Sequence, residues 1–176
     1  EGIRFDASKE SISGLKTLTE DGVLTAGSSS QICDGAAAIM IVNDAGLDKL
    51  GLKPRAKIIS LALAGDDPVI MLTGPIPASK TVLEKADLSI NDIDIYEVNE
   101  AFAPVPLAWA HELKADKEKL NVNGGAMALG HPLGGTGAKL MTTLLHELER
   151  REGKYGLQAI CEGGGTANAM IIERLN

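Results

Sequence analysis

Two glycine-rich stretches near the C-terminus constrain this chain more than any other feature. Eleven of its 20 glycines lie between residues 121 and 165. The stretch at 121–132 reads NVNGGAMALGHP and contains His131, and a second stretch begins at Cys161, followed by Glu162 and three glycines. Glycine allows positive φ angles and lets the backbone approach a ligand closely, at an entropic cost to the fold. The glycines are too dense for ordinary core packing, so they predict tight turns built around a bound molecule.

A histidine and a cysteine held in such turns indicate cysteine–histidine chemistry. A nearby base raises the thiolate fraction of a cysteine, and the thiolate is the reactive form. The alternative is purely structural, with Cys161 as a small buried apolar residue and His131 as a hydrogen-bonded turn residue. The occurrence of both residues in glycine turns favours the chemical interpretation.

The composition is that of one globular domain with an aliphatic core. A chain of 176 residues is long enough to bury a core of its own. Hydrophobic residues make up 44% of it and aromatic residues only 3%. No apolar run approaches the ~20 residues that a membrane-spanning helix needs, so we expect no membrane span.

The net charge limits the kinds of partner that we expect, and the cysteine content indicates the cell compartment. The net charge of −7 argues against nucleic acid, whose binding needs clustered basic residues. An anionic ligand would have to be met by local positive groups, because the overall field repels it. Two cysteines fit a reducing compartment better than a disulfide scaffold, so we expect a cytoplasmic location.

Apolar runs and helical periodicity alternate along the chain. The runs predict strands at 36–43, 55–64, 93–98, 157–161 and 167–172. Helices are predicted at 44–50, at 75–86, in the part of 100–114 that follows Pro104 and Pro106, and at 136–150. Alternating strands and helices predict an α/β layered fold with a largely parallel sheet, whose final two strands are antiparallel.

Several motifs resemble those of one enzyme family, in its order and at its spacing. GGAMALGHPLGGTGAKL resembles the histidine segment of thiolases, the family of acetyl-CoA acetyltransferases and 3-ketoacyl-CoA thiolases, and CEGGGTANAMIIERL resembles their C-terminal cysteine segment. Further matches are NEAFA at 99–103, TAG at 25–27, DGAA at 34–37 and GPIPAS at 74–79.

The resemblance implies a fold and a domain organisation. Residues 32–176 would form the C-terminal thiolase domain, a layered βαβαβαββ half with a mixed, mostly parallel sheet. Residues 1–31 would be the tail of the CoA-binding loop domain. In this family the nucleophilic cysteine lies in the N-terminal half, and the surroundings of Cys33 do not resemble it. We therefore expect the chain, which starts at Glu1 without a methionine, to be the C-terminal part of a thiolase that is inactive alone.

The resemblance also implies catalytic roles for four residues. Thiolases cleave or form the carbon–carbon bond next to a thioester, passing the acyl group through a cysteine. His131 resembles the residue that activates the nucleophilic cysteine and donates to the thioester oxygen, and Asn99 the one that holds a water in the same oxyanion hole. The backbone N–H of Gly163 resembles the donor for the acyl-enzyme oxyanion. Cys161 resembles the second acid/base, which exchanges the α-proton.

Binding positions and partners follow from the same resemblance. Ser30 aligns with a serine that contacts the pantetheine arm of coenzyme A, and Arg4 with a cation near its nucleotide. Met71 and Phe102 match positions that line the acyl pocket. We expect acyl-CoA and coenzyme A as substrates or products, no further cofactor and no metal, an N-terminal thiolase half as partner, and a homodimer or homotetramer.

Two residues differ from the commonest thiolase pattern, and these differences bear on the direction of the reaction. Ser28 replaces the asparagine of many members, and Glu162 replaces an apolar residue found in many biosynthetic ones, so the chain looks more like degradative 3-ketoacyl-CoA thiolases of lipid or sterol breakdown.

Two alternative functions remain. One is a catalytically silent CoA-binding or assembly module of the same fold. The other is a decarboxylating condensing enzyme of the ketoacyl-synthase type, but such enzymes lack a counterpart of Cys161.

Overall fold

Four strands form one mixed sheet in the order β1–β4–β3–β2. The computed structural model describes residues 2–175, and the strands are β1 (Ala56–Gly65), β2 (Ile95–Val98), β3 (Tyr155–Cys161) and β4 (Thr166–Arg174). β2 pairs in parallel with β3, whereas β4 is antiparallel to both β1 and β3. Three strands therefore run in one direction, and the predicted α/β class, mixed sheet and closing antiparallel pair are confirmed.

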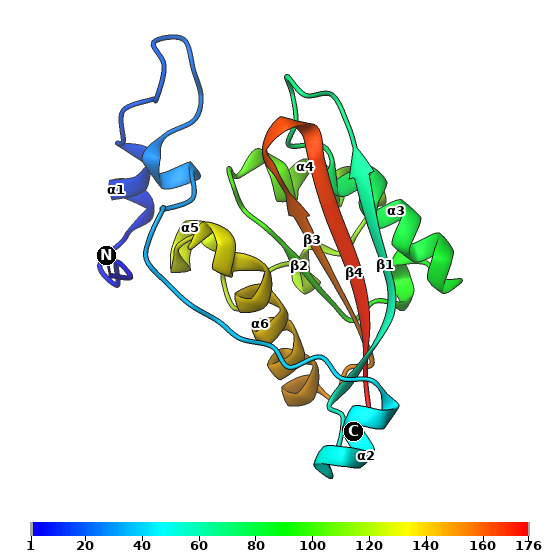
Figure 1. The fold of residues 1–176 in the computed structure, drawn as a ribbon. Helices are drawn as coiled ribbons and strands as arrows, with labels where there is room; N and C mark the ends of the chain where they lie inside the picture. Colours follow the sequence, from blue (N-terminus) through cyan, green and yellow to red (C-terminus); the bar gives the residue numbers. More distant parts are fainter. Residues whose placement is uncertain (1, 176) are drawn as a thin grey trace.

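Helices cover the sheet from both sides (Figure 1). The described helices are α1 (Lys9–Ser13), α2 (Asp44–Leu50), α3 (Pro75–Ala86), α4 (Pro104–Leu113), α5 (Ala126–Leu129) and α6 (Thr136–Arg151), of which α3, α4 and α6 cover the sheet. α3 and α4 pack on one face of the sheet, in the larger core cluster. α6 packs on the other face, in a smaller cluster with Ile95 and Ile172. The strands thus contribute alternate side chains to two cores, as expected where both faces are covered.

Local sequence signals set the helix ends. α2 ends at Gly51, whose φ of 62° is the left-handed conformation that glycine adopts without strain. α4 begins at Pro104, and so the expectation that regular helix starts only after both prolines is wrong. Proline is tolerated in the first turn because the N–H groups there have no intrahelical partner in any case.

The strand predicted at 36–43 is absent. These residues are extended but belong to no ladder, and they are exposed, with Met40 at 73% and Ile41 at 70%. Figure 1 shows this segment as a coil between the N-terminal region and α2. An apolar run becomes a strand only where a neighbouring strand accepts its backbone hydrogen bonds. No segment within 2–175 supplies that neighbour.

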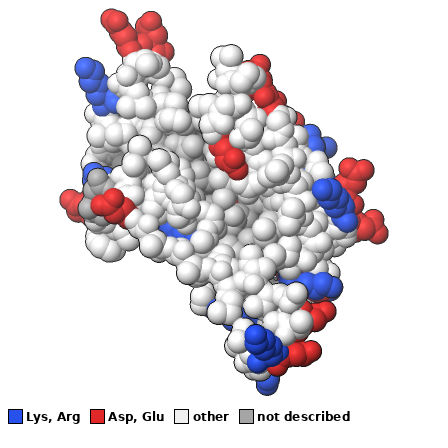
Figure 2. Space-filling view, viewed as in Figure 1, with Lys and Arg blue, Asp and Glu red and all other residues white. Residues whose placement is uncertain are grey.

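A second apolar surface lies on β1. Leu61 and Leu63, which point away from α3, are 56% and 81% exposed. In Figure 1 no helix lies in front of β4 and β1, in contrast to the opposite face. Figure 2 shows charged side chains mainly around the rim of this view, whereas the middle is mostly uncharged. The described residues therefore leave one side of the sheet only partly covered.

Candidate active site

The carboxyl ends of β2 and β3 bring two of the predicted residues together. These strands are parallel neighbours, so their ends meet at one edge of the sheet. Asn99 directly follows β2 and its N–H donates to the Ala159 carbonyl at 3.0 Å, while Cys161 ends β3. The Asn99 side chain lies beside the Cys161 thiol and acts to lower its pKa, although no hydrogen bond of ordinary geometry joins them.

The Cys161 thiol is kept protonated by its surroundings. The residue is 8% exposed, and burial raises the thiol pKa because it disfavours the thiolate. The Glu162 carboxylate raises it further, and Asn99 offsets only part of the effect. Asn168 Nδ2 donates to Glu162 Oε1 at 2.6 Å, which fixes this carboxylate next to the cysteine. At neutral pH Cys161 is therefore a thiol, ready to act as an acid.

The turn after Cys161 exposes backbone. Gly163 is exposed, and no atom of the described residues lies within 4 Å of the position that a Cβ would take there. Gly165 has a φ of 81°, and a Cβ on it would lie 2.5 Å from the Asp66 carbonyl oxygen. The Asp66 N–H donates to the Gly165 carbonyl at 2.7 Å. The open side of the turn leaves room for a ligand at Gly163, and its closed side is packed on the loop that leads to Met71.

His131 lies in a turn between α5 and α6. Its N–H donates to the Gln31 carbonyl at 2.7 Å, and Ile32 forms a parallel bridge with it. The preceding Gly130 has a φ of 88°, and a Cβ there would lie 2.5 Å from the Cys33 sulfur. The N-terminal segment therefore reaches the histidine turn, and Cys33 lies close to it in space although far from it in sequence.

Hydrogen bonds around Thr136 identify the tautomer of the imidazole. His131 Nδ1 is 2.6 Å from Thr136 Oγ1, and the Thr136 hydroxyl donates to the Pro132 carbonyl at 3.1 Å. A hydroxyl has only one proton to donate, and when it goes to the Pro132 carbonyl, Nδ1 carries the proton in the bond to Thr136. The remaining nitrogen, Nε2, then has its lone pair free and can accept a proton.

The electrostatic surroundings keep this imidazole neutral. Burial lowers the pKa of His131, and the positive charge of Lys139 lowers it further. At neutral pH His131 is a base with a free nitrogen, and Cys161 is a protonated acid. A neutral base and a protonated acid are the two kinds of group that proton transfer needs.

Residues 52–174 match the family model described as thiolase, C-terminal domain. The chain belongs to the thiolase family. It is 58% identical over 175 residues to the steroid 3-ketoacyl-CoA thiolase FadA6 of Mycobacterium tuberculosis, covering 99% of this chain and 43% of that protein. The predicted membership and its C-terminal position are confirmed.

Solved structures of thiolases share the fold of this chain. An acetyl-CoA acetyltransferase of Bacillus anthracis superposes with a TM-score of 0.94 at 44% identity, covering 98% of this chain and 44% of that one. Human mitochondrial 3-ketoacyl-CoA thiolase in complex with CoA superposes with a TM-score of 0.92 at 43% identity, covering 99% and 45%. The chain thus spans somewhat less than half the length of these relatives.

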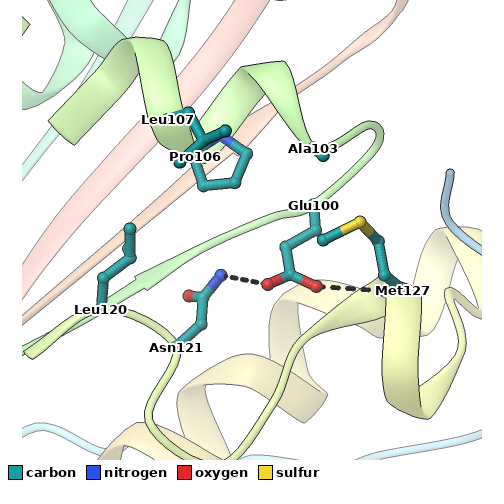
Figure 3. A pocket seen from close by; sticks show the side chains of 7 residues that line it. All are labelled: Glu100, Ala103, Pro106, Leu107, Leu120, Asn121 and Met127. Atoms are coloured by element: carbon teal, nitrogen blue, oxygen red, sulfur yellow. Dashed lines mark hydrogen bonds between the residues drawn. The ribbon is translucent and has the colours of Figure 1, made fainter. Parts of the chain in front are cut away.

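The thiolase motifs are tied together by a carboxylate that sequence reasoning did not single out. Glu100 Oε1 accepts from Asn121 Nδ2 at 2.8 Å, and Oε2 accepts from the Met127 N–H at 3.1 Å (Figure 3). Gly125 approaches so closely that a Cβ would lie 2.3 Å from the Glu100 carboxyl carbon. Glu100 therefore fixes the asparagine motif against the first glycine stretch. The sequence signal that could have identified Glu100 is its position within the NEAFA motif.

The binding candidates lie around the same region. The Ser30 N–H donates to the Ala101 carbonyl at 3.0 Å, and Phe102 forms a bridge with Ser29. Met71 is half-buried with a φ of 43°. Arg4 is exposed and donates to Gln31 Oε1 at 3.2 Å. Ser30 and Phe102 are thus joined to the asparagine motif, and Arg4 is linked to the histidine turn through Gln31.

The two best-defined pockets are not lined by Asn99, His131 or Cys161. One pocket of about 240 Å³ lies between Glu100, Met127 and the start of α4 (Figure 3). Another, of about 390 Å³, is lined by residues 32–35 and 132–135, beside the histidine turn. Among residues 2–175 no group of three or more His, Cys, Asp or Glu side chains could hold a metal ion. Within the same range, no helix is both long and apolar enough to span a membrane.

Proposed function

We propose that this chain is the C-terminal part of a thiolase that cleaves or forms 3-ketoacyl-CoA through an acyl-cysteine on an N-terminal half. The observation that carries the proposal is that burial favours a neutral His131, with Nδ1 engaged by Thr136, and a protonated Cys161. Acyl transfer of this kind needs one base for the nucleophile and one acid for the carbon that leaves.

In the cleavage direction His131 takes the proton of the nucleophilic cysteine through Nε2. The thiolate attacks the 3-keto carbon, and the backbone N–H of Gly163 donates to the oxygen that becomes negative. The bond between the second and third carbons then breaks, and its electron pair stays on the leaving acetyl-CoA. Imidazole and the water on Asn99 donate to the thioester oxygen of this enolate, which stabilises its charge.

Cys161 completes the cleavage by giving its proton to that carbanion, and it regains one from the incoming coenzyme A thiol. The coenzyme A thiolate then takes the acyl group, and the nucleophilic cysteine leaves as a thiolate that regains its proton from His131. The raised pKa of Cys161 keeps it in the protonated form that this acid role uses. In synthesis the same group acts in reverse, and its thiolate takes the α-proton.

Two observations point to a substrate class. We assign the chain to degradation of 3-ketoacyl-CoA in fatty acid or lipid metabolism, with sterol-derived acyl groups as the first class to test. Support comes from Glu162 beside Cys161 and from a relative named as a steroid 3-ketoacyl-CoA thiolase. Coenzyme A is the substrate or product in this proposal, and no other cofactor is invoked.

The proposed partner is the N-terminal half. The apolar segment 36–43 and the exposed Leu61 and Leu63 of β1 are surfaces that it would cover. Residues 1–31 would complete the CoA-binding loop domain, and 32–176 the C-terminal domain. Ser30 and Arg4 would bind coenzyme A, and Met71 and Phe102 would line the acyl pocket. The assembly is proposed to be a cytoplasmic homodimer or homotetramer.

Activity of the purified chain tests the proposal. The 176-residue chain alone is expected to show no cleavage of acetoacetyl-CoA, and coexpression with the N-terminal half of a relative is expected to restore it. A Cys33→Ala variant is the control, because Cys33 lies close to His131 in space. Cleavage by the chain alone that disappears in this variant would show that Cys33 is the nucleophile and would overturn the proposal.

Coenzyme A binding separates the silent module from the enzyme. The alternative module would bind coenzyme A but give no turnover even when both halves are present. An intact mass of the source protein equal to that of this chain would also favour the module. A mass more than twice as large would favour the enzyme, because the relatives are more than twice as long.

A further inference from the structure

A lysine on α6 holds the backbone immediately before His131. Lys139 Nζ donates to the Gly130 carbonyl at 2.7 Å and lies 3.4 Å from the Leu129 carbonyl. These two carbonyls end α5, a helix of only four residues. A cation at the C-terminus of a helix satisfies carbonyl groups that have no intrahelical donor. Lys139 therefore stabilises a short helix whose own hydrogen bonds are few.

The same bond fixes the plane of one peptide group. The Gly130 carbonyl accepts from Lys139, and the His131 N–H of that same peptide donates to the Gln31 carbonyl at 2.7 Å. Both polar groups of the peptide before the histidine are thus held from opposite directions. Gly130, with its φ of 88°, would otherwise allow this peptide to rotate freely. Rotation there would move the imidazole that follows.

Lys139 also interacts through its charge with a buried carboxyl group. Glu97 on β2 is fully buried, and neither of its oxygens has a hydrogen-bond partner among the described residues. Gln158, its register partner on β3, has an unpartnered Oε1. Burial raises the pKa of Glu97 to about 8, with a further increase from Glu100 and Glu147, while Lys139 acts to lower it. Burial thus favours the uncharged form of Glu97, whereas Lys139 favours the charged form.

We propose that Lys139 is a positioning residue for His131, which orients the imidazole by holding the Gly130 carbonyl and acts on it through its positive charge. The inference rests on the proposed role of His131 as a base. The geometry carries it, because the ammonium group binds the one peptide that determines where the imidazole lies. Among the charged and titratable groups, Lys139 acts on both His131 and Glu97, while Glu100 and Glu147 act on Glu97, and Cys33 lies beside Gly130.

Three variants of the full-length enzyme separate position from charge. Lys139→Arg keeps a cationic donor, Lys139→Gln keeps a neutral donor, and Lys139→Met keeps neither. Lys80→Met, an exposed lysine on α3, is the matched control. The measurements are kcat and KM for thiolysis across pH, together with NMR titration of the His131 ring, which is assigned by its loss in His131→Gln.

The expected result is a graded one. Lys139→Met should lower kcat about 10- to 100-fold, since small displacements of a catalytic group have effects of this order. It should also raise the pKa of His131 and move the acid limb of the rate profile to higher pH. Lys139→Gln should show the pKa change with a smaller loss of kcat. Lys139→Arg should restore most of the rate and the acid limb, and Lys80→Met should match the wild type.

Two outcomes would overturn the inference. One is an unchanged His131 titration in both Lys139→Met and Lys139→Gln. The other is a Lys139→Arg variant as impaired as Lys139→Met, which would indicate packing alone. If Lys139→Met does not fold, the Gln and Arg variants still decide the matter. The NMR titration does not depend on turnover, so an inactive wild type would refute the proposed function without affecting the test of Lys139.

Discussion

The turns that carry His131 and Cys161 have similar compositions but are held in different ways. Other elements fix the histidine turn, through the Gln31 carbonyl, Thr136 and Lys139 on α6. The cysteine turn is held by the strands that it joins, with Asn168 bonded to Glu162, and on one side only by the Asp66 N–H, which donates to the Gly165 carbonyl. One turn is clamped from outside, whereas the other is open at Gly163. The first suits a base that must stay in place, and the second suits a backbone donor that must reach a ligand.

The comparison also shows one physical cause acting in two ways. Burial is the largest influence on both groups, lowering the pKa of His131 and raising that of Cys161. In each case it disfavours the charged form, which is the imidazolium for histidine and the thiolate for cysteine. Burial thus favours the neutral form of both groups, in which His131 can act as a base and Cys161 as an acid. Lys139 and Glu162 strengthen the two shifts by their charges.

The largest effect is expected for Cys161. In the full-length enzyme, Cys161→Ala should still form an acyl-enzyme, because that step uses the other cysteine and His131. Exchange of the α-protons of acetyl-CoA with deuterated water should fall by about 10³–10⁴-fold, the upper range for a positioned acid/base. Mass spectrometry of the adduct and NMR of deuterium uptake measure the two. Loss of the adduct with normal exchange would reverse the roles of the two turns.

A somewhat smaller loss is expected for His131. Replacing it with alanine removes the base and one oxyanion donor together, for a decrease of about 10²–10³-fold in acylation. The two losses do not simply multiply, since the groups act as a unit. Rapid-quench measurement of acyl-enzyme formation tests this. A decrease below about tenfold would remove His131 from the acylation step, and His146→Ala, on the exposed side of α6, is the control.

Substitution of Thr136 tests whether the histidine turn depends on its hydrogen bond to α6. Thr136→Val removes the acceptor for Nδ1–H, and the freed imidazole can adopt the other tautomer. One lost hydrogen bond of about 1.4 kcal/mol corresponds to about tenfold in kcat. Thr136→Ser keeps the hydroxyl and should retain most of the activity. Equal activity in the valine and serine variants would show that the clamp does not set the tautomer.

The pH profile of the wild type sharpens the contrast between the two groups. A base works above its pKa and an acid below it. The acid limb of kcat/KM for cleavage is therefore expected below the ordinary histidine value of 6.5, and the limb due to Cys161 above the ordinary thiol value of 9.0. Comparison with Cys161→Ser identifies the alkaline limb. An acid limb above 6.5 would mean that His131 is not the neutral base described.

The smallest effect concerns stability. Gly165→Ala in the cysteine turn places a Cβ 2.5 Å from the Asp66 oxygen at a φ of 81°, whereas Gly134→Ala in the histidine turn meets open space. Thermal unfolding should show a loss of roughly 1–3 kcal/mol for the first, the usual cost of such backbone strain. The second should be near neutral. Similar values for both would mean that the cysteine turn can relax.

Much of the fold was predictable because the decisive signals are local. The periodicity of 136–150 gave α6, and Gly51 marked the end of α2. The apolar run 36–43 has a composition as strand-like as that of β1, yet only β1 pairs. Composition describes what a segment can do, but hydrogen-bonded pairing needs a partner strand, and residues 2–175 contain none for this run.

The sequence by itself determined the family, the α/β class and the residue types of the candidate site, because glycine, histidine, asparagine and cysteine stand at fixed places in recognisable motifs. Only the tertiary structure decided which nitrogen of His131 is free, that burial makes Cys161 an acid, and that Glu100 and Lys139 hold the turns. Protonation and orientation depend on desolvation and on groups far apart in sequence. Such groups meet only when the chain is folded.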